Sequence, residues 1–323
     1  MKYQFCKLSL QVLFCFLTLA SFAQDRSSGE KQVYLMSYFT GNGESGLHLA
    51  FSYDGYHWDA LFDGKPVLKP TIGKDKLMRD PSIVQDDNGV FHMVWTTGWW
   101  DKGIGYAASR DLIQWTSQKN IPVMKKYPKA KNSWAPELFF DQRDKTFYIL
   151  WASTIPGTFE EVPTSESEKG LNHRQFYTYT KDFDTFKETQ LFLDPGFSVI
   201  DGMILKRDSD YYLFIKNENS APAEKNIRYI KSKNVDLFSE EVSAPITGDY
   251  WAEGPSAITK GDYVYVYFDK YIEGKYGAVR SKDMKKWEDV SDKVVFPKGT
   301  RHGTIFAVSE SFFENLISQK INW

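Results

Sequence analysis

Cysteine is nearly absent from this chain, because only Cys6 and Cys15 among its 323 residues carry a thiol. Basic blocks are absent too: 42 Asp and Glu residues balance 40 Lys and Arg residues, so no electrostatic footprint for nucleic acid or an anionic membrane is expected. Beyond the N-terminus no hydrophobic run is long enough for a membrane span. Helical periodicity is missing almost throughout, whereas aromatic residues reach 16%. Both features favour an all-β protein.

The first 23 residues have the pattern of a signal peptide. Lysines precede an apolar run over residues 8–20, and the small residues Ser21 and Ala23 stand where a signal peptidase requires them. We therefore expect cleavage after Ala23, a mature chain over residues 24–323 and a periplasmic or secreted location. Both cysteines leave with this segment, so core packing alone must stabilise the mature chain.

One turn motif, Ser/Thr-x-Asp/Asn-x-x-x-Trp/Phe, recurs at intervals of roughly 50–70 residues. The Ser and Asp side chains of such a motif close a turn on nearby backbone amides, and the aromatic residue enters the next strand and packs inward. Each copy therefore marks a hairpin. The first and last residues of the five copies are Ser52 and Trp58, Ser109 and Trp115, Thr180 and Phe186, Ser232 and Phe238, and Ser281 and Trp287.

Pairs of apolar strands, joined by polar turns, interleave with these hairpins. In the first pair, residues 79–84 lead through Asp-Asp-Asn-Gly into residues 90–96. The other pairs are 134–140 with 147–152, 199–205 with 211–216, and 251–258 with 263–268. Each pair and its hairpin form a four-stranded antiparallel blade, and blades repeated about a centre make a β-propeller.

The two ends of the chain determine the number of blades. Residues 31–61 supply only three strands, and residues 301–308 supply one strand with no blade after it. Pairing the C-terminal strand with the N-terminal three completes a fifth blade. The sequence thus predicts an all-β, single-domain, five-bladed β-propeller, with one short helix near residues 313–321.

Polar residues cluster where the inner strands begin, and these strand ends converge on the central axis. Asp80, Asp201 and Glu253 are carboxylates at three of these five starts, while Trp134-Ala-Pro-Glu137 and His302 mark the other two. A single carboxylate beside Pro or Gly could simply end a loop. Three carboxylates around one axis indicate a functional site.

The order of the carboxylates around the ring suggests their roles. Asp201 and Glu253 lie on neighbouring blades, so the pKa of one should be raised, which suits a proton donor. Glu253 has the longer side chain and can reach a leaving-group oxygen. Asp80 lies two blades away, which leaves room for a substrate and a water. A general acid and a general base about 6.5–9.5 Å apart are typical of an inverting glycosidase.

At these residues the sequence resembles glycoside hydrolase family 43, the five-bladed propeller hydrolases of arabinose-, xylose- and galactose-containing plant polysaccharides. The resemblance covers essentially the whole mature chain. It implies that Arg-Asp-Pro-Ser carries the general base, Asp80, that Ile-Asp-Gly carries the pKa modulator, Asp201, and that Glu-Gly-Pro-Ser carries the general acid, Glu253. Gly202 departs from the family, where Pro is frequent. The resemblance also implies inversion of the anomeric carbon.

His302 and its neighbour Arg301 are further candidates for the site. A lone histidine is often only a hydrogen-bonded structural residue. The resemblance, however, implies a position in the central channel, below the sugar and near a water cluster or a structural calcium, so His302 is an indirect metal candidate. The sequence contains no acidic cluster with calcium-loop spacing. No cofactor is required for the predicted chemistry.

Exposed aromatic residues should form the platform for the sugar, because the C–H faces of a sugar stack on flat apolar rings. The blade topology places Trp99 and Trp100 at the rim, with Trp134 and Trp251 beside the inner strand starts. The long loop 153–173 could wall off one side of the pocket, which favours removal of terminal sugars from an oligo- or polysaccharide by a monomeric enzyme.

Several alternatives remain at this stage. Fructan-cleaving propellers need an Asn-Asp-Pro-Asn-like nucleophile segment, and sialidases need an arginine triad and a tyrosine nucleophile; neither signal is found. A non-catalytic glycan-binding propeller would not need three carboxylates. The sequence favours α-L-arabinofuranose as the sugar, ahead of β-xylose and of galactose- or arabinose-containing chains.

Overall fold

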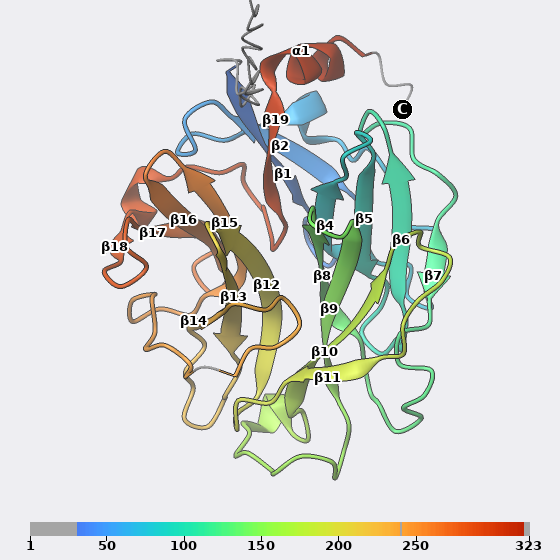
Figure 1. The fold of residues 1–323 in the computed structure, drawn as a ribbon, viewed down its shortest axis with the longest axis vertical. Helices are drawn as coiled ribbons and strands as arrows, with labels where there is room; N and C mark the ends of the chain where they lie inside the picture. Colours follow the sequence, from blue (N-terminus) through green and yellow to red (C-terminus); the bar gives the residue numbers. More distant parts are fainter. Residues whose placement is uncertain (1–30, 240, 320–323) are drawn as a thin grey trace, which may run out of the picture. The chain divides into compact units, whose positions relative to one another are not determined.

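Five antiparallel sheets surround a common centre in residues 31–239 and 241–319, the part of the chain that the computed structural model describes (Figure 1). The chain from Gln32 onward belongs to one compact unit. One end strand of each sheet lies innermost, and these inner strands follow one another around the centre. The predicted five-bladed β-propeller is confirmed. The predicted signal peptide, residues 1–23, lies outside the described residues.

We number the blades by the chain order of their inner strands. Blade 1 contains β4 (Arg79–Gln85), β5 (Phe91–Thr96), β6 (Ile104–Ser109) and β7 (Lys119–Ile121). Blade 2 contains β8 (Trp134–Asp141), β9 (Thr146–Thr154), β10 (His173–Thr180) and β11 (Gln190–Leu193). Blade 3 contains β12 (Val199–Arg207), β13 (Asp210–Asn217) and β14 (Ile227–Ser232). Blade 4 contains β15 (Glu253–Lys260), β16 (Tyr263–Lys270), β17 (Lys275–Ser281) and β18 (Glu288–Asp289). Blade 5 contains β19 (Ile305–Ser309), β1 (Gln32–Tyr38), β2 (His48–Ser52) and β3 (Asp59–Ala60).

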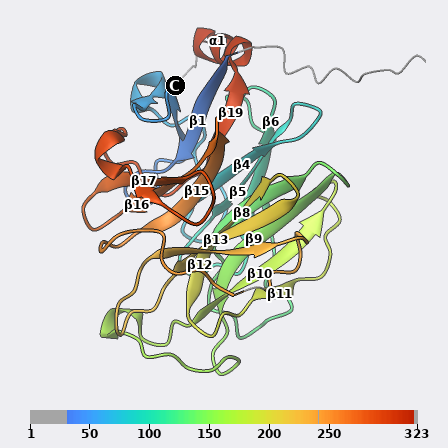
Figure 2. The same cartoon turned by 60° about the vertical axis from the view of Figure 1, so that its left-hand side comes forward.

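Blade 5 closes the ring as the sequence predicts. β19 pairs antiparallel with β1 from Gln32 opposite Ser309 to Met36 opposite Ile305, and β2 and β3 follow on the other side. Figures 1 and 2 show β1 and β19 side by side. The two ends of the described chain therefore share one sheet.

Blade 3 departs from the four-stranded pattern. Three strands are assigned to it within the described residues. The segment after β14 nevertheless runs along that strand, because Ser243 and Ile246 donate backbone hydrogen bonds to Tyr229 and Ile227. This segment takes the place of the fourth strand without regular pairing.

The recurring turn motif has the predicted structure. In its first copy, the backbone N–H groups of Tyr56 and His57 donate to Asp54 Oδ1 over 2.7 and 2.8 Å, and Gly55 donates to Ser52 Oγ over 2.8 Å. The aromatic residue of each copy packs into a hydrophobic cluster of its own. These five clusters form the core of the propeller.

The C-terminal helix α1 spans Glu310–Ser318, three residues earlier than its predicted start. Ser309 Oγ accepts the backbone N–H of Phe312 over 3.1 Å and so caps the first turn. Phe313 and Leu316 pack into the cluster that also holds residues of blades 1 and 5. The end of the predicted range, residues 320–321, lies outside the described residues. No described helix is long and apolar enough to cross a bilayer.

The inner strands of blades 1 to 4 begin with the same irregularity. In each, the pairing with the second strand slips at the start, so the extra residue forms a β-bulge. The bulged residue has a left-handed φ, which costs energy unless the residue is glycine and which occurs often at functional sites. These residues are Asp80 (51°), Ala135 (46°), Asp201 (55°) and Gly254 (61°).

Candidate active site

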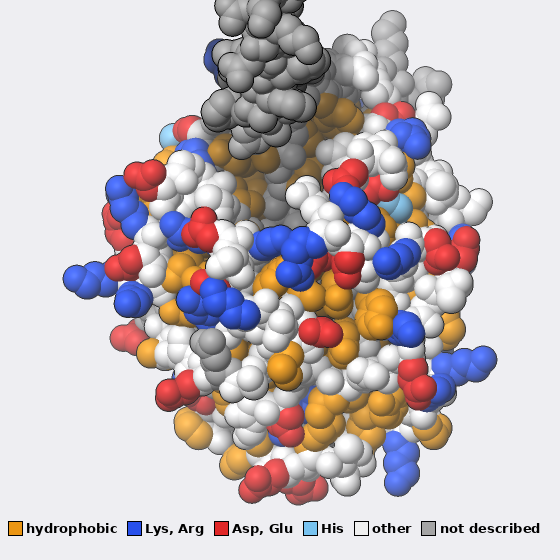
Figure 3. Space-filling model, in the orientation of Figure 1, with side chains coloured by type: hydrophobic (Ala, Val, Ile, Leu, Met, Phe, Trp, Pro, Cys, Tyr) orange, Lys and Arg blue, Asp and Glu red, His pale blue; other side chains and the backbone are white. Residues whose placement is uncertain are grey.

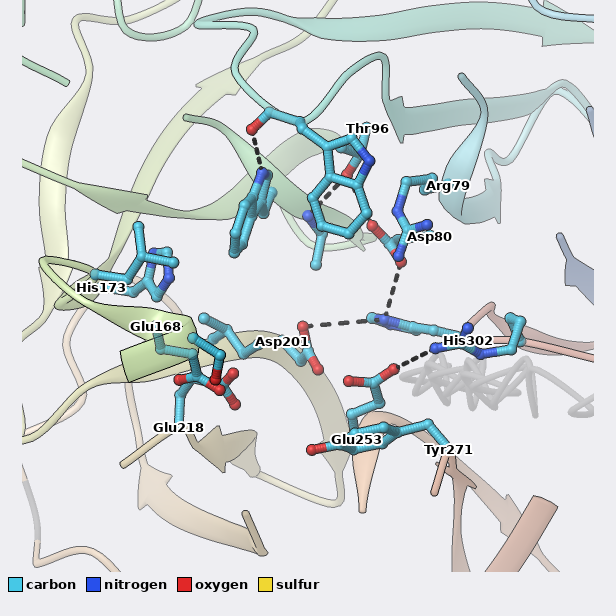
Figure 4. A pocket seen from close by; sticks show the side chains of 17 residues that line it. Arg79, Asp80, Thr96, Glu168, His173, Asp201, Glu218, Glu253, Tyr271 and His302 are labelled. Carbon is cyan, nitrogen blue, oxygen red and sulfur yellow. Dashed lines mark hydrogen bonds and ion pairs between the residues drawn. The ribbon is translucent and has the colours of Figure 1, made fainter. Parts of the chain in front are cut away.

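A cavity of about 320 Å³ opens where the inner strands begin (Figure 4). Asp80, Asp201 and Glu253 all line it, and so do Arg301 and His302. Blades 1, 3, 4 and 5 therefore bring these five predicted site residues together.

Asp80 is held by a hydrogen bond on one side and by an ion pair on the other. Thr96 Oγ1 donates to Asp80 Oδ2 over 2.8 Å and accepts the backbone N–H of Ala135 over 2.9 Å. Because the backbone bond occupies the acceptor side of the hydroxyl, its one proton points to Asp80. The other carboxylate oxygen lies 3.4 Å from His302 Nδ1.

Asp201 is buried and accepts the backbone N–H of Gly254 on Oδ2 over 2.9 Å, while its Oδ1 lies 3.9 Å from His302 Nδ1. Burial raises the pKa of Asp201 to about 6, and the negative charges of Glu253 and Asp80 contribute to the rise. The Asp201 carboxyl is therefore the member of the Asp201–Glu253 pair that holds a proton more readily.

Glu253 has both carboxylate oxygens paired with cations. Oε2 lies 3.1 Å from Lys216 Nζ, and Oε1 lies 2.9 Å from Arg301 Nη2. Burial opposes the charged form, but Lys216 and Arg301 outweigh it and lower the pKa of Glu253 to about 2. The sequence predicts a raised pKa for one member of the Asp201–Glu253 pair, and Asp201 is that member. Glu253, the predicted proton donor, has a lowered pKa instead, because Lys216 and Arg301 reach it from other blades.

His302 lies between the carboxylates (Figure 4). Burial alone would lower its pKa, but the negative charges of Asp201 and Asp80 overcome this and raise it. The imidazolium therefore holds these two aspartates together. A Cβ at Gly254 would lie 2.3 Å from His302 Cγ, so only glycine fits there.

The three carboxylates do not occupy equivalent strand positions, contrary to the prediction. Asp80 and Asp201 are the bulged residues of their strands, whereas in blade 4 the bulged residue is Gly254 and Glu253 precedes it. The close approach of His302 explains the difference, because a side chain at position 254 would collide with it. The longer Glu253 reaches the cavity from one residue earlier.

The predicted aromatic platform is only partly at the cavity. Trp99 and Trp134 line it, and the indole Nε1 of Trp134 donates to the backbone carbonyl of Trp99 over 2.7 Å. Arg79 Cζ lies 4.4 Å from the Trp99 ring centroid, which adds a cation–π contact. Trp100 and Trp251, 57% and 40% exposed, are not among the residues that line the cavity. Either ring could contact only a longer substrate.

The loop 153–173 forms one wall of the cavity, as predicted, with Ser167, Glu168 and Leu171 in the lining. His173, the last residue of this loop, also lines the cavity, whereas Glu218 and Tyr271 are lining residues that the sequence did not indicate. Burial lowers the pKa of His173 to about 3, so its imidazole is neutral. No sequence motif distinguishes Glu218 or Tyr271. Only their position directly after the second strand of a blade could have suggested them.

A structural calcium near His302 stays a prediction. The described residues contain no group of three or more His, Cys, Asp or Glu side chains placed to hold a metal ion. Glu137 is buried near the centre, where Thr304 Oγ1 lies 3.4 Å from both of its carboxylate oxygens. Burial raises the pKa of Glu137 to about 7.

The surface outside the cavity carries charges of both signs. On the face shown in Figure 3, Lys and Arg side chains alternate with Asp and Glu side chains, and hydrophobic side chains lie between them. This mixed pattern follows from the near balance of acidic and basic residues in the sequence.

Five blades with three carboxylates gathered at a small cavity are the arrangement expected of a propeller-type glycoside hydrolase. The chain belongs to the family described as "Probable glycosyl hydrolase domain", which is related to glycoside hydrolase family 43 and matches residues 30–314.

Two α-L-arabinofuranosidases and one family 43 glycoside hydrolase are among the proteins that this chain resembles. A stretch of 146 residues is 30% identical to an α-L-arabinofuranosidase of Bifidobacterium longum subsp. longum, and it covers 43% of this chain but 14% of that protein. The chain thus spans a small part of the length of this relative. The α-L-arabinofuranosidase of Lactobacillus brevis has a similar fold, with a TM-score of 0.52, 13% identity, and coverage of 66% of this chain and 72% of that one. A thermostable family 43 glycoside hydrolase also has a similar fold, with a TM-score of 0.54 and 15% identity. The match covers 71% of this chain and 82% of that one.

Proposed function

We propose that the protein is an inverting, exo-acting glycoside hydrolase that releases terminal α-L-arabinofuranose from plant polysaccharides. The observation that carries this proposal is the convergence of Asp80 and Glu253 on one small cavity, with Asp201 beside Glu253. Family membership adds the reaction class, and the arabinofuranosidase relative from Bifidobacterium longum adds the sugar.

The chemistry assigned to each carboxylate is a single displacement. Asp80 removes a proton from water as the water oxygen attacks the anomeric carbon, and Glu253 gives its proton to the glycosidic oxygen as that bond breaks. Asp201 and Glu253 titrate as a pair. Asp201 acts on Glu253 through its charge and its position, because a carboxylate beside Glu253 favours the protonated form that can give up a proton.

The small walled cavity favours a terminal sugar over an internal segment of a chain. We expect a panel of 4-nitrophenyl glycosides, followed by branched arabinan and arabinogalactan, to give the fastest release with α-L-arabinofuranoside. A β-xylosidase, or a hydrolase of galactan or arabinan chains, is the next candidate and would prefer the corresponding substrate. Binding of these glycans without any release would instead indicate a non-catalytic glycan-binding propeller.

The stereochemistry of the first product tests the single displacement. If Asp80 activates water directly, the sugar is released with inverted configuration. Proton NMR in the first minutes, before mutarotation, should therefore show the inverted anomer. Initial release of the retained anomer would mean a covalent intermediate and would make Asp80 a nucleophile.

We also propose that the protein is exported and acts as a monomer in the periplasm or outside the cell. The intact mass of protein recovered from an expressing bacterium should correspond to residues 24–323. Light scattering on the same sample should give the mass of one chain. Retention of Met1 would reject the proposed export, and the mass of a dimer would reject the proposed monomer.

A further inference from the structure

Two lysine side chains are buried beside the cavity. Lys216 on β13 and Lys225, which precedes β14, are each 1% exposed. A buried ammonium group is stable only when carboxylates compensate for its lost hydration. The partners of each lysine therefore indicate its role.

Glu218 lies between the two lysines and pairs with both. Its Oε2 is 2.7 Å from Lys216 Nζ, and its Oε1 is 2.9 Å from Lys225 Nζ. Lys225 Nζ also lies 2.6 Å from Glu168 Oε1, on the wall loop. Lys225 thus fastens the wall loop to blade 3.

Lys216 has two contacts that Lys225 lacks. Its Nζ also lies 3.1 Å from Glu253 Oε2, and the Tyr271 ring centroid is 4.8 Å away. Glu218, Glu253 and Tyr271 therefore surround one ammonium group. Because Lys216 is fixed in this way, it cannot move away from Glu253 without leaving a buried charge unpaired.

We propose that Lys216 is a positioning residue for the acid step: its ion pair holds the Glu253 carboxyl at the cavity and determines the pH range over which that carboxyl carries a proton. This inference rests on the proposed function, in which Glu253 is the general acid. Lys216 and Asp201 act on Glu253 in opposite directions, since a nearby cation favours the carboxylate and a nearby anion favours the acid.

Other charged and titratable groups also face Glu253. They belong to the inner strands of blades 1 and 3, to the second and third strands of blade 4, and to the segments after β16 and before β19. These groups are Asp80, Asp201, Asp269, Tyr271, Tyr276, Arg301 and His302. A change at Lys216 leaves all of these groups in place, so the pH profile isolates the contribution of Lys216.

The test compares the basic limb of the kcat/KM pH profile among variants. This limb reports loss of the proton held by the Asp201–Glu253 pair in the free enzyme. Lys216→Met removes a cation, so the pKa of Glu253 should rise and the limb should move to higher pH by about one to three units. Lys216→Arg keeps the charge and should leave the limb in place. Lys225→Met removes an equally buried lysine that does not contact Glu253, and it should also leave the limb in place.

Asp201→Asn and Glu218→Gln extend the test if Lys216→Met does not fold. Each removes a negative charge that opposes the lysine, so each should move the limb to lower pH. A limb that stays in place in the folded Lys216→Met variant, or in Glu218→Gln, would overturn the inference. An active Glu253→Gln variant would instead overturn the proposed function, so the two failures are distinguishable.

Discussion

Replacing Asp80 by Asn is expected to lower kcat by about 10²–10⁴-fold, the usual contribution of a general base. An amide cannot take the proton of the attacking water, but it has nearly the shape of the carboxylate and can still accept the hydrogen bond from Thr96 Oγ1. The loss should therefore be the same for glycosides with good and poor leaving groups. Steady-state kinetics on 4-nitrophenyl and 2,4-dinitrophenyl arabinofuranosides would measure it.

Thr96→Val is the matched control for this result. It keeps Asp80 but removes the hydroxyl that orients it, so a smaller decrease in kcat is expected. Circular dichroism and thermal melts should show that both variants remain folded. Turnover near the wild-type rate in the Asp80→Asn variant would reject Asp80 as the base.

Replacing Glu253 by Gln should produce a loss that depends on the leaving group. A dinitrophenolate leaves without a proton, so its release should be reduced only slightly. An oligosaccharide or alkyl leaving group needs the proton, and its release should fall by about 10²–10⁴-fold. The ratio of the two rates, measured for wild type and variant, checks the assignment of the acid.

Asp269→Asn is the control for a change in the position of Arg301, the cation that pairs with both Asp269 and Glu253. Asp269 pairs with Arg301 Nε, yet it is not among the residues that line the cavity. Its loss should not change the ratio between good and poor leaving groups. If Glu253→Gln slows both kinds of substrate equally, another group supplies the proton.

The architecture could be predicted from the sequence because its signals are local. Each hairpin is closed by a Ser or Thr followed two residues later by an Asp or Asn, so the turn motif alone marks the blades. The isolated terminal strand at residues 301–308 indicated the closure with β1. Blade 3 was less predictable, because its outer segment hydrogen-bonds to β14 without regular pairing.

The electrostatics of the site could not be predicted, because they arise between blades. Lys216 and Arg301 reach Glu253 from blades 3 and 5, and nothing in their sequence context marks them as its partners. The predicted equivalence of the carboxylates failed for a steric reason that is also non-local, the approach of His302 to Gly254.

The pairing of β19 with β1 also has a consequence for the order in which the protein can acquire activity. Contacts between the first and last strands form late, because the cost of closing so long a loop must be met before those contacts contribute. Arg301 and His302 belong to this final segment, and they hold Glu253, Asp80 and Asp201. During synthesis, the earlier blades can therefore form while the aspartates at their centre still lack the imidazolium that offsets their mutual repulsion. We therefore expect the nascent chain to become active only after β19 has been synthesised and has paired with β1.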